Sequence, residues 1–255
     1  MKHLIALIIL SSIIIISCDN DDDPVVVPET TTDLVLNFEF KVGTEALELG
    51  TGRYVLGNED TVSIDQFKFI LSNLTLRQSD GGKWIDEEGY YLVKASNGVT
   101  NFQLTIEDVP VGNYSSMEFH IGMDSAMNFK PESFPILFQQ EGMYWDWNTG
   151  YKFLLLEGRY FSDSLSTPNN STGLTAHIGD MINLEIPQFS FSDTLILESE
   201  NAGRVNFNVD LGKIYTEPNV LSLKEANNRN IMGGPNALLI VENYGNGMIV
   251  ITSIE

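Results

Sequence analysis

Two of the chain's three tryptophans lie in one ten-residue segment, residues 142–151, which reads Gly-Met-Tyr-Trp-Asp-Trp-Asn-Thr-Gly-Tyr. In an extended strand, Trp145 and Trp147 would lie on one side and Asp146 on the other. Each indole buries about 150–250 Å², so core packing alone could account for the pair. Oxidisable aromatic and methionine side chains also gather at redox and copper sites. Both interpretations stay open on the residues alone.

A carboxylate follows this segment on a face where carboxylates are rare. Glu157 shares strand parity with Tyr151, Phe153 and Leu155, so it is predicted to point toward the same side as these apolar residues. A carboxylate in such a place is costly unless it is paired or bound to a metal.

Histidine is scarce, with three in 255 residues. His120 and His177 each lie next to an Ile-Gly pair, with Asp124 and Asp180 soon after. Imidazole binds copper or zinc and a thioether prefers Cu(I). A lone histidine in a strand is more often a surface residue than a ligand, so the surface interpretation stays open too. The candidate metal ligands are His177, His120, Glu157, Asp124 and Met143.

The N-terminus predicts export and lipidation. A short basic start is followed by an apolar run over residues 4–16, which is too short to span a membrane and suits a signal peptide. The run ends in Ile-Ser-Cys at the chain's only cysteine, Cys18, which resembles the lipobox of bacterial lipoproteins. Residues 1–17 are therefore expected to be a signal peptide, with Cys18 carrying the lipid anchor to the membrane. Residues 18–33, rich in acids, are expected to form a disordered tether.

The charge balance excludes one class of partner. The chain has 14 Lys and Arg against 35 Asp and Glu, a formal net charge of −21. Nucleic acid is not expected as a partner, because phosphate binding depends on basic side chains. A single cysteine also excludes an internal disulfide framework.

Period-two alternation dominates residues 34–255. Leu34, Leu36, Phe38 and Phe40 share one face of a predicted strand, and alternation also favours strand over helix in residues 64–76. Further strands are predicted at 90–94, 102–106, 117–121, 151–156, 181–186, 194–198, 205–209 and 237–241, with a hairpin turn at 243–247. The pattern predicts an all-β fold, a single antiparallel β-sandwich domain behind the lipoprotein signal and the acidic linker.

Several of these segments resemble, in order, the MbnP-like copper-binding proteins associated with methanobactin. They are residues 37–40, 67–76, 90–93, 119–124, 143–151, 156–158, 177–179 and 209–210. The resemblance implies a β-sandwich that binds one copper ion. It also implies a diheme, peroxidase-like partner that oxidises a tryptophan, for which Trp145 and Trp147 are the candidates. His177 matches the family's His-x-Gly motif and His120 is the next candidate ligand, although His-Ile-Gly-Asp stands here where the family has His-Leu-Gly-Gly.

The expected function is therefore that of a non-enzymatic outer-membrane lipoprotein that binds copper, for acquisition or for delivery to a transporter or an outer-membrane receptor. An alternative is a surface lipoprotein that binds glycan or protein through an aromatic platform of Trp145, Tyr144 and Trp84. A third interpretation is a hydrolase in which Glu157 works with Asp124 or Asp146. The copper hypothesis depends on the indoles and imidazoles meeting in one pocket.

Overall fold

The computed structural model describes residues 30–99, 101–134, 136–145, 150–162 and 170–255. The predicted signal peptide, Cys18 and most of the tether lie outside the described residues, as do Asp146 and Trp147. The first strand begins at Thr31, three residues before the predicted start of the domain at residue 34.

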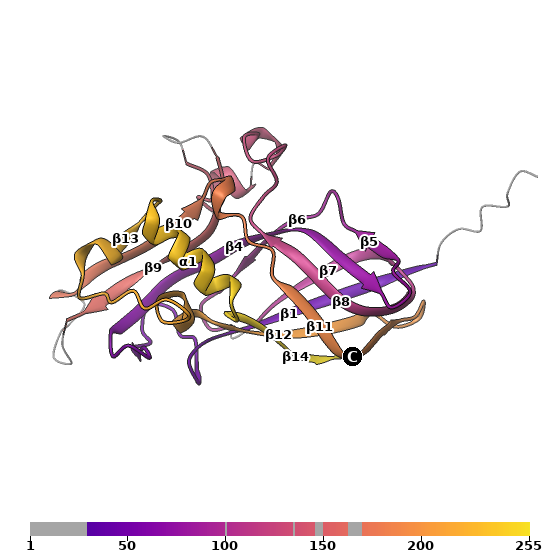
Figure 1. Ribbon diagram of the computed structural model, residues 1–255, viewed down its shortest axis with the longest axis horizontal. Helices are drawn as coiled ribbons and strands as arrows, with labels where there is room; N and C mark the ends of the chain where they lie inside the picture. The colour runs from indigo at the N-terminus through magenta and orange to yellow at the C-terminus, as the bar shows by residue number, and fades with distance from the viewer. Residues whose placement is uncertain (1–29, 100, 135, 146–149, 163–169) are drawn as a thin grey trace, which may run out of the picture.

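Within the described residues, the strands form a five-stranded and a nine-stranded sheet (Figure 1). The smaller sheet has the order β14 (Ile249–Ile254), β12 (Gly203–Asp210), β1 (Thr31–Val42) and β2 (Glu45–Ala46), with β7 (Asn101–Pro110) also paired to β1. The larger sheet has the order β11 (Gln188–Leu197), β8 (Gly112–Ile121), β4 (Thr61–Gln78), β9 (Lys152–Phe161), β10 (Thr172–Gly179) and β13 (Asn230–Ile231). The short strands β3 (Tyr54–Val55), β5 (Lys83–Ile85) and β6 (Tyr90–Lys94) also pair with β4.

The all-β sandwich-like fold is confirmed, but the sheets are mixed rather than purely antiparallel. β1 pairs in parallel with β12, from Leu34 opposite Gly203 to Lys41 opposite Asp210. β10 pairs in parallel with β13. Alternation within one strand reveals its buried face but not the direction of its neighbour, so the sequence pattern could not distinguish these pairings.

The main core lies between the sheets and follows the predicted alternation. Phe38 of β1 stacks on Phe207 of β12 with ring centroids 5.0 Å apart. It also meets Phe69 of β4 edge to face at 5.8 Å. Offset and edge-to-face contacts are the favoured arrangements of aromatic pairs, and they join the two sheets here.

Two predicted strands are wrong. Residues 237–241 belong to the helix α1 (Pro235–Gly245), and the predicted hairpin at 243–247 is its C-terminal end. Pro235 suits the first position of a helix, and Ala237, Ile240, Val241 and Tyr244 are buried at helical spacing. Residues 181–186 are not a strand either, because Met181–Asn183 forms a 3₁₀ turn. Other short turns are Pro131–Ser133, Leu211–Tyr215 and Ala226–Asn228 (3₁₀) and Ile136–Gln140 (π).

A second, smaller apolar cluster covers the other face of the larger sheet. Phe69, Leu71, Leu154 and Leu156 belong to the main core, whereas the alternate residues Ile70, Phe153 and Leu155 pack with the second cluster. We call this second side the outer face. The loop between β8 and β9 covers it, contributing Met123, Leu137, Met143 and Tyr151. On the inner side, the buried residues of α1 join the main core, and α1 lies beside β10 (Figure 1). Among the described residues, no helix is both long and apolar enough to cross a membrane.

Candidate functional site

The structure pairs the predicted histidine with the predicted carboxylate. His177 on β10 and Glu157 on β9 lie two register positions apart on neighbouring strands, since His177 is opposite Leu155 and Thr175 is opposite Glu157. His177 Nε2 lies 2.8 Å from Glu157 Oε1. Glu157 Oε2 accepts a hydrogen bond of 3.3 Å from Gln66 on β4. Glu157 therefore shares the outer face with Leu155, as its parity predicted.

Burial keeps the imidazole neutral. It lowers the pKa of His177 below its ordinary value, and the nearby Lys152 lowers it further, while the hydrogen bond to Glu157 acts in the opposite direction. His177 is 9% exposed. A neutral imidazole is the form that binds a metal ion, so this side chain is ready to act as a ligand at neutral pH.

Trp145 lies in the loop between β8 and β9 and packs against Gly179, which is two residues beyond His177 on β10. Tyr144 bridges to Tyr151, and the Trp145 amide donates to the carbonyl of Gly150 at 3.1 Å. This short pairing brings the indole onto Gly179, where an added Cβ would come within 2.6 Å of Trp145 Cζ3. The glycine of the His-x-Gly segment thus makes room for the indole, which is 4% exposed.

His120 lies in a different part of the outer face. It is opposite Ser72 on β4, whereas His177 is opposite Leu155, which is opposite Lys68. Four residues of strand correspond to about 13 Å. The structure therefore brings His177 and Glu157 together, places Trp145 against Gly179 two residues beyond His177, and leaves His120 outside that group.

Asp124 lies on the His120 side. It accepts a hydrogen bond from the hydroxyl of Tyr90, and its Oδ1 also accepts the amide of Ala126 at 2.8 Å. Burial lowers the pKa of His120, while Asp124 and Glu118 oppose that shift. The Nδ1 atom of His120 is buried and has no hydrogen-bond partner in the part of the chain that the structure describes. Asp124 is thus engaged by the loop and Tyr90 rather than by His177.

Met143 and a pair of lysines hold the covering loop. Met143 is fully buried in the cluster that contains Leu155, the residue opposite His177. Glu141 binds Lys68 at 3.0 Å and also Lys94. Burial raises the pKa of Glu141, but the hydrogen bonds from both lysines outweigh it and leave the pKa below its ordinary value. The sequence pattern predicted Met143 but did not predict Glu141, Lys68, Lys94 or Gln66. Lys68 nevertheless stands out as a charge inside the apolar run of residues 67–71.

The donor set can be tested against a copper ion. An imidazole nitrogen and a carboxylate oxygen 2.8 Å apart can both lie about 2.0–2.2 Å from one ion. Imidazole is a ligand that copper prefers. Within the described part of the chain, no group of three or more His, Cys, Asp or Glu side chains could hold a metal. His177 and Glu157 could therefore supply two ligands to one metal ion. Any third ligand would have to be a group other than a His, Cys, Asp or Glu side chain of the described residues.

The two alternative sites are less well assembled. Trp84 packs against the main core, whereas Tyr144 packs against the second cluster on the other face of the sheet. These rings do not form one platform with Trp145. Glu157 is opposite Gln66, and Tyr90, which binds Asp124, is opposite Ser72, six residues or about 20 Å further along β4. Glu157 and Asp124 therefore do not face each other as an acid–base pair.

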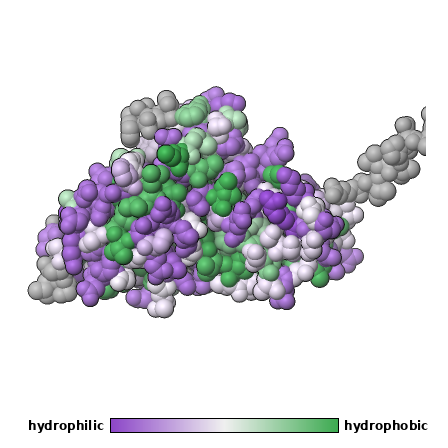
Figure 2. Space-filling model, viewed as in Figure 1, coloured by the Kyte–Doolittle hydropathy of each residue, from purple (hydrophilic) through white to green (hydrophobic). Residues whose placement is uncertain are grey.

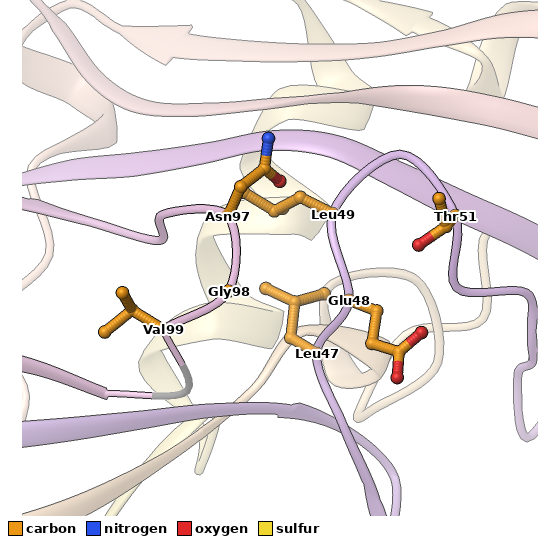
Figure 3. A pocket seen from close by; sticks show the side chains of 7 residues that line it. All are labelled: Leu47, Glu48, Leu49, Thr51, Asn97, Gly98 and Val99. Atoms are coloured by element: carbon orange, nitrogen blue, oxygen red, sulfur yellow. The ribbon is translucent and has the colours of Figure 1, made fainter.

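A cavity of about 510 Å³ lies between the 47–51 loop and the 97–99 turn (Figure 3). None of the candidate site residues that the structure describes lines it. Leu47 and Leu49 lie between the two loops, while the Glu48 carboxylate points away from the turn. With one charged side chain directed outward, this cavity offers no group of donors for a metal.

The lowered histidine pKa values predict a pH dependence of folding. An unfolded histidine has a pKa near 6.5, so the metal-free native state binds fewer protons than the unfolded state below that value. The free energy of unfolding should therefore keep its full histidine contribution above about pH 6.5. Below that pH it should decrease as the pH falls, by at most about 1.4 kcal/mol per pH unit for each histidine. Denaturant unfolding between pH 7.5 and 5 measures it, with the H120Q/H177Q double variant as reference. An equally steep loss in that variant would show that carboxylates cause the dependence instead.

The fold and the site together define a β-sandwich protein with a histidine–carboxylate pair beside a buried tryptophan, on the outer face of its larger sheet. A family model for MbnP matches residues 31–233, which is more than half of the chain. The chain therefore belongs to the MbnP family, and the resemblance found in the sequence is confirmed.

Among solved structures, the chain is similar to MbnP from Methylosinus trichosporium. The identity is 13% and the TM-score is 0.49, over 73% of this chain and 78% of that one. No curated protein matches the chain.

Proposed function

We propose that this protein binds copper at the outer face of its larger sheet, with His177 and Glu157 as ligands and Trp145 beside them. The observation that carries the proposal is the 2.8 Å contact between His177 Nε2 and Glu157 Oε1, made by an imidazole whose burial favours the neutral form. Copper would take the place of the hydrogen bond between the two side chains, with the proton of the neutral imidazole carried on Nδ1. The MbnP family is linked to methanobactin and to copper, which supports this metal over others.

The proposed role is acquisition or delivery of copper rather than catalysis. Copper is cargo in this proposal, passed to a transporter or an outer-membrane receptor. The net charge of −21 would raise the local concentration of cations without selecting among them.

We further propose that a tryptophan of the 142–151 segment is oxidised by a diheme, peroxidase-like partner. Trp145 and Trp147 are the candidates. Support for Trp145 comes from its position on Gly179, two residues beyond His177 on β10, where a change in the ring would alter the surroundings of that ligand.

The proposed location is the outer membrane of a bacterial envelope, through lipid on Cys18. The apolar run and the Ile-Ser-Cys sequence support cleavage before Cys18. Two or three acyl chains would give stable anchoring, since one chain alone binds only marginally.

Three measurements on one preparation test these elements together. Protein isolated from its native envelope should show, by intact mass, loss of residues 1–17 and a lipid on Cys18. Metal analysis of the same sample should give close to one copper per chain, and peptide mapping should place any oxidation within 142–151. Absence of copper, with full retention of another metal, would contradict the copper proposal, and an unprocessed N-terminus would contradict the lipoprotein proposal.

A further inference from the structure

A cavity of about 410 Å³ lies where β10 ends. Gly179 and residues that follow it line this cavity, and His177 does not. The walls of the cavity come from three segments of the chain. They are Trp145 of the loop on the outer face, Gly179, Asp180, Ile182 and Asn183 at the end of β10 and just after it, and Met232, Gly233, Gly234 and Leu238 around the start of α1. This volume lies in the range of small-molecule sites.

The cavity has an apolar wall that is open to solvent. Ile182, Met232 and Leu238 line it and are 72%, 40% and 39% exposed. Trp145 completes this wall. Figure 2 shows the face that carries α1, where hydrophobic surface interrupts the polar surroundings. Apolar side chains from three separate segments thus meet around one hollow.

A buried hydrogen-bond acceptor accompanies the apolar wall. Asn183 lines the cavity and is 4% exposed. Its Nδ2 donates to the carbonyl of Gly179 at 2.5 Å, which fixes the orientation of the amide. Among the described residues, its Oδ1 is buried with no hydrogen-bond partner. Buried polar atoms nearly always have a partner, so this oxygen indicates a donor that the described part of the chain does not supply.

The remaining polar side chain in the wall is also an acceptor. Asp180 lines the cavity and accepts the amide of Met181 at 2.6 Å. We propose that this cavity binds a small, neutral, apolar molecule that carries an N–H or O–H donor, with its hydrocarbon part on Trp145, Met232 and Leu238 and its donor on Asn183 Oδ1. The site is separate from the proposed copper ligands, and its occupant need not contain a metal.

Indole and benzofuran form a matched pair of probes, because they share a bicyclic shape and only indole has an N–H. With methyl-labelled methionine, the Met232 signal can be assigned from the M232L variant and followed during titration. A chelator keeps the protein free of copper, so the result does not depend on the copper proposal. Indole should shift the Met232 signal saturably, and benzofuran should bind about tenfold or more weakly, since it leaves Asn183 Oδ1 without a partner.

Two variants locate the site. L238D and I182D place a charge on the apolar wall at exposed positions on different segments, so one remains informative if the other fails to fold. Each should weaken indole binding about tenfold or more, whereas V220D, at a position 66% exposed outside the cavity lining, should not. The proposal is overturned by the lack of a saturable Met232 shift, by equal affinity for both probes, or by unchanged binding in folded L238D and I182D.

Discussion

Replacing His177 with alanine should reduce the protein's copper affinity by at least about a hundredfold. Loss of a residue that only supports a metal ligand already costs about 10–100-fold, and His177 is proposed to be a ligand itself. The H120A variant is the matched control. His120 is also a partly buried histidine on the outer face of the larger sheet, but it lies about 13 Å away along β4 and should leave the affinity within about threefold.

Competition with a chromogenic copper chelator measures these affinities, and circular dichroism checks that each variant is folded. E157Q adds a second test at the same pair, because it keeps the shape of the side chain and its contact with Gln66 while removing the charge. It should weaken binding less than H177A but more than H120A. If H177A and H120A retain copper equally well, the ligand assignment fails. If only H120A loses copper, the site lies beside Asp124 instead.

The sequence predicted the strands that build the site because their alternation is strong. The faces of β1, β4, β8 and β12 follow from aromatic and aliphatic residues at every second position, buried between the sheets. The same parity placed Glu157 beside Leu155 on the outer face. The contact between Glu157 and His177 could not be predicted in this way, because strand parity does not reveal that β10 is the neighbour of β9.

The separation of His120 from His177 could not be predicted for the same reason. Both histidines precede an Ile-Gly pair and both lie on outward positions, so their local patterns are alike. Their distance depends on the register of β8 and β9 along β4, which is set by long-range pairing and by bulges. One pocket for both imidazoles was therefore a reasonable hypothesis that the register does not support.

The two wrongly predicted strands share a location. Asp180 caps the 3₁₀ turn of Met181–Asn183 locally, whereas α1 covers part of the main core at the end where β10 lies. Both also line the cavity next to Trp145. Conflicts between local pattern and observed structure are expected at functional sites, which supports a binding role for this region.

The Gly158→Ala substitution should lower the free energy of unfolding by about 3 kcal/mol, at the upper end of the usual cost of overpacking. An added Cβ would lie 2.0 Å from the backbone carbonyl oxygen of Ser63 on β4, and a backbone atom in the sheet cannot rotate away. β4 has a bulge here, between Ile64 and Gln66, opposite Gly158 and Glu157. Gly158 thus allows the close approach that brings Gln66 and Glu157 together.

The matched control is G173A, on the neighbouring strand β10. Gly173 is opposite Arg159, and an added Cβ there would meet nothing within 4 Å. Alanine should be neutral or stabilising by about 0.5–1 kcal/mol at this position. Thermal and denaturant unfolding compare the two variants, and the copper titration of folded G158A asks whether Glu157 has moved. Equal stability of G158A and G173A would contradict the tight approach of β4 and β9. If G158A is destabilised but binds copper normally, Gly158 contributes only to the packing of the sheet. If G158A binds copper more weakly although all the ligands are present, the close approach of β4 and β9 also positions Glu157 for the metal.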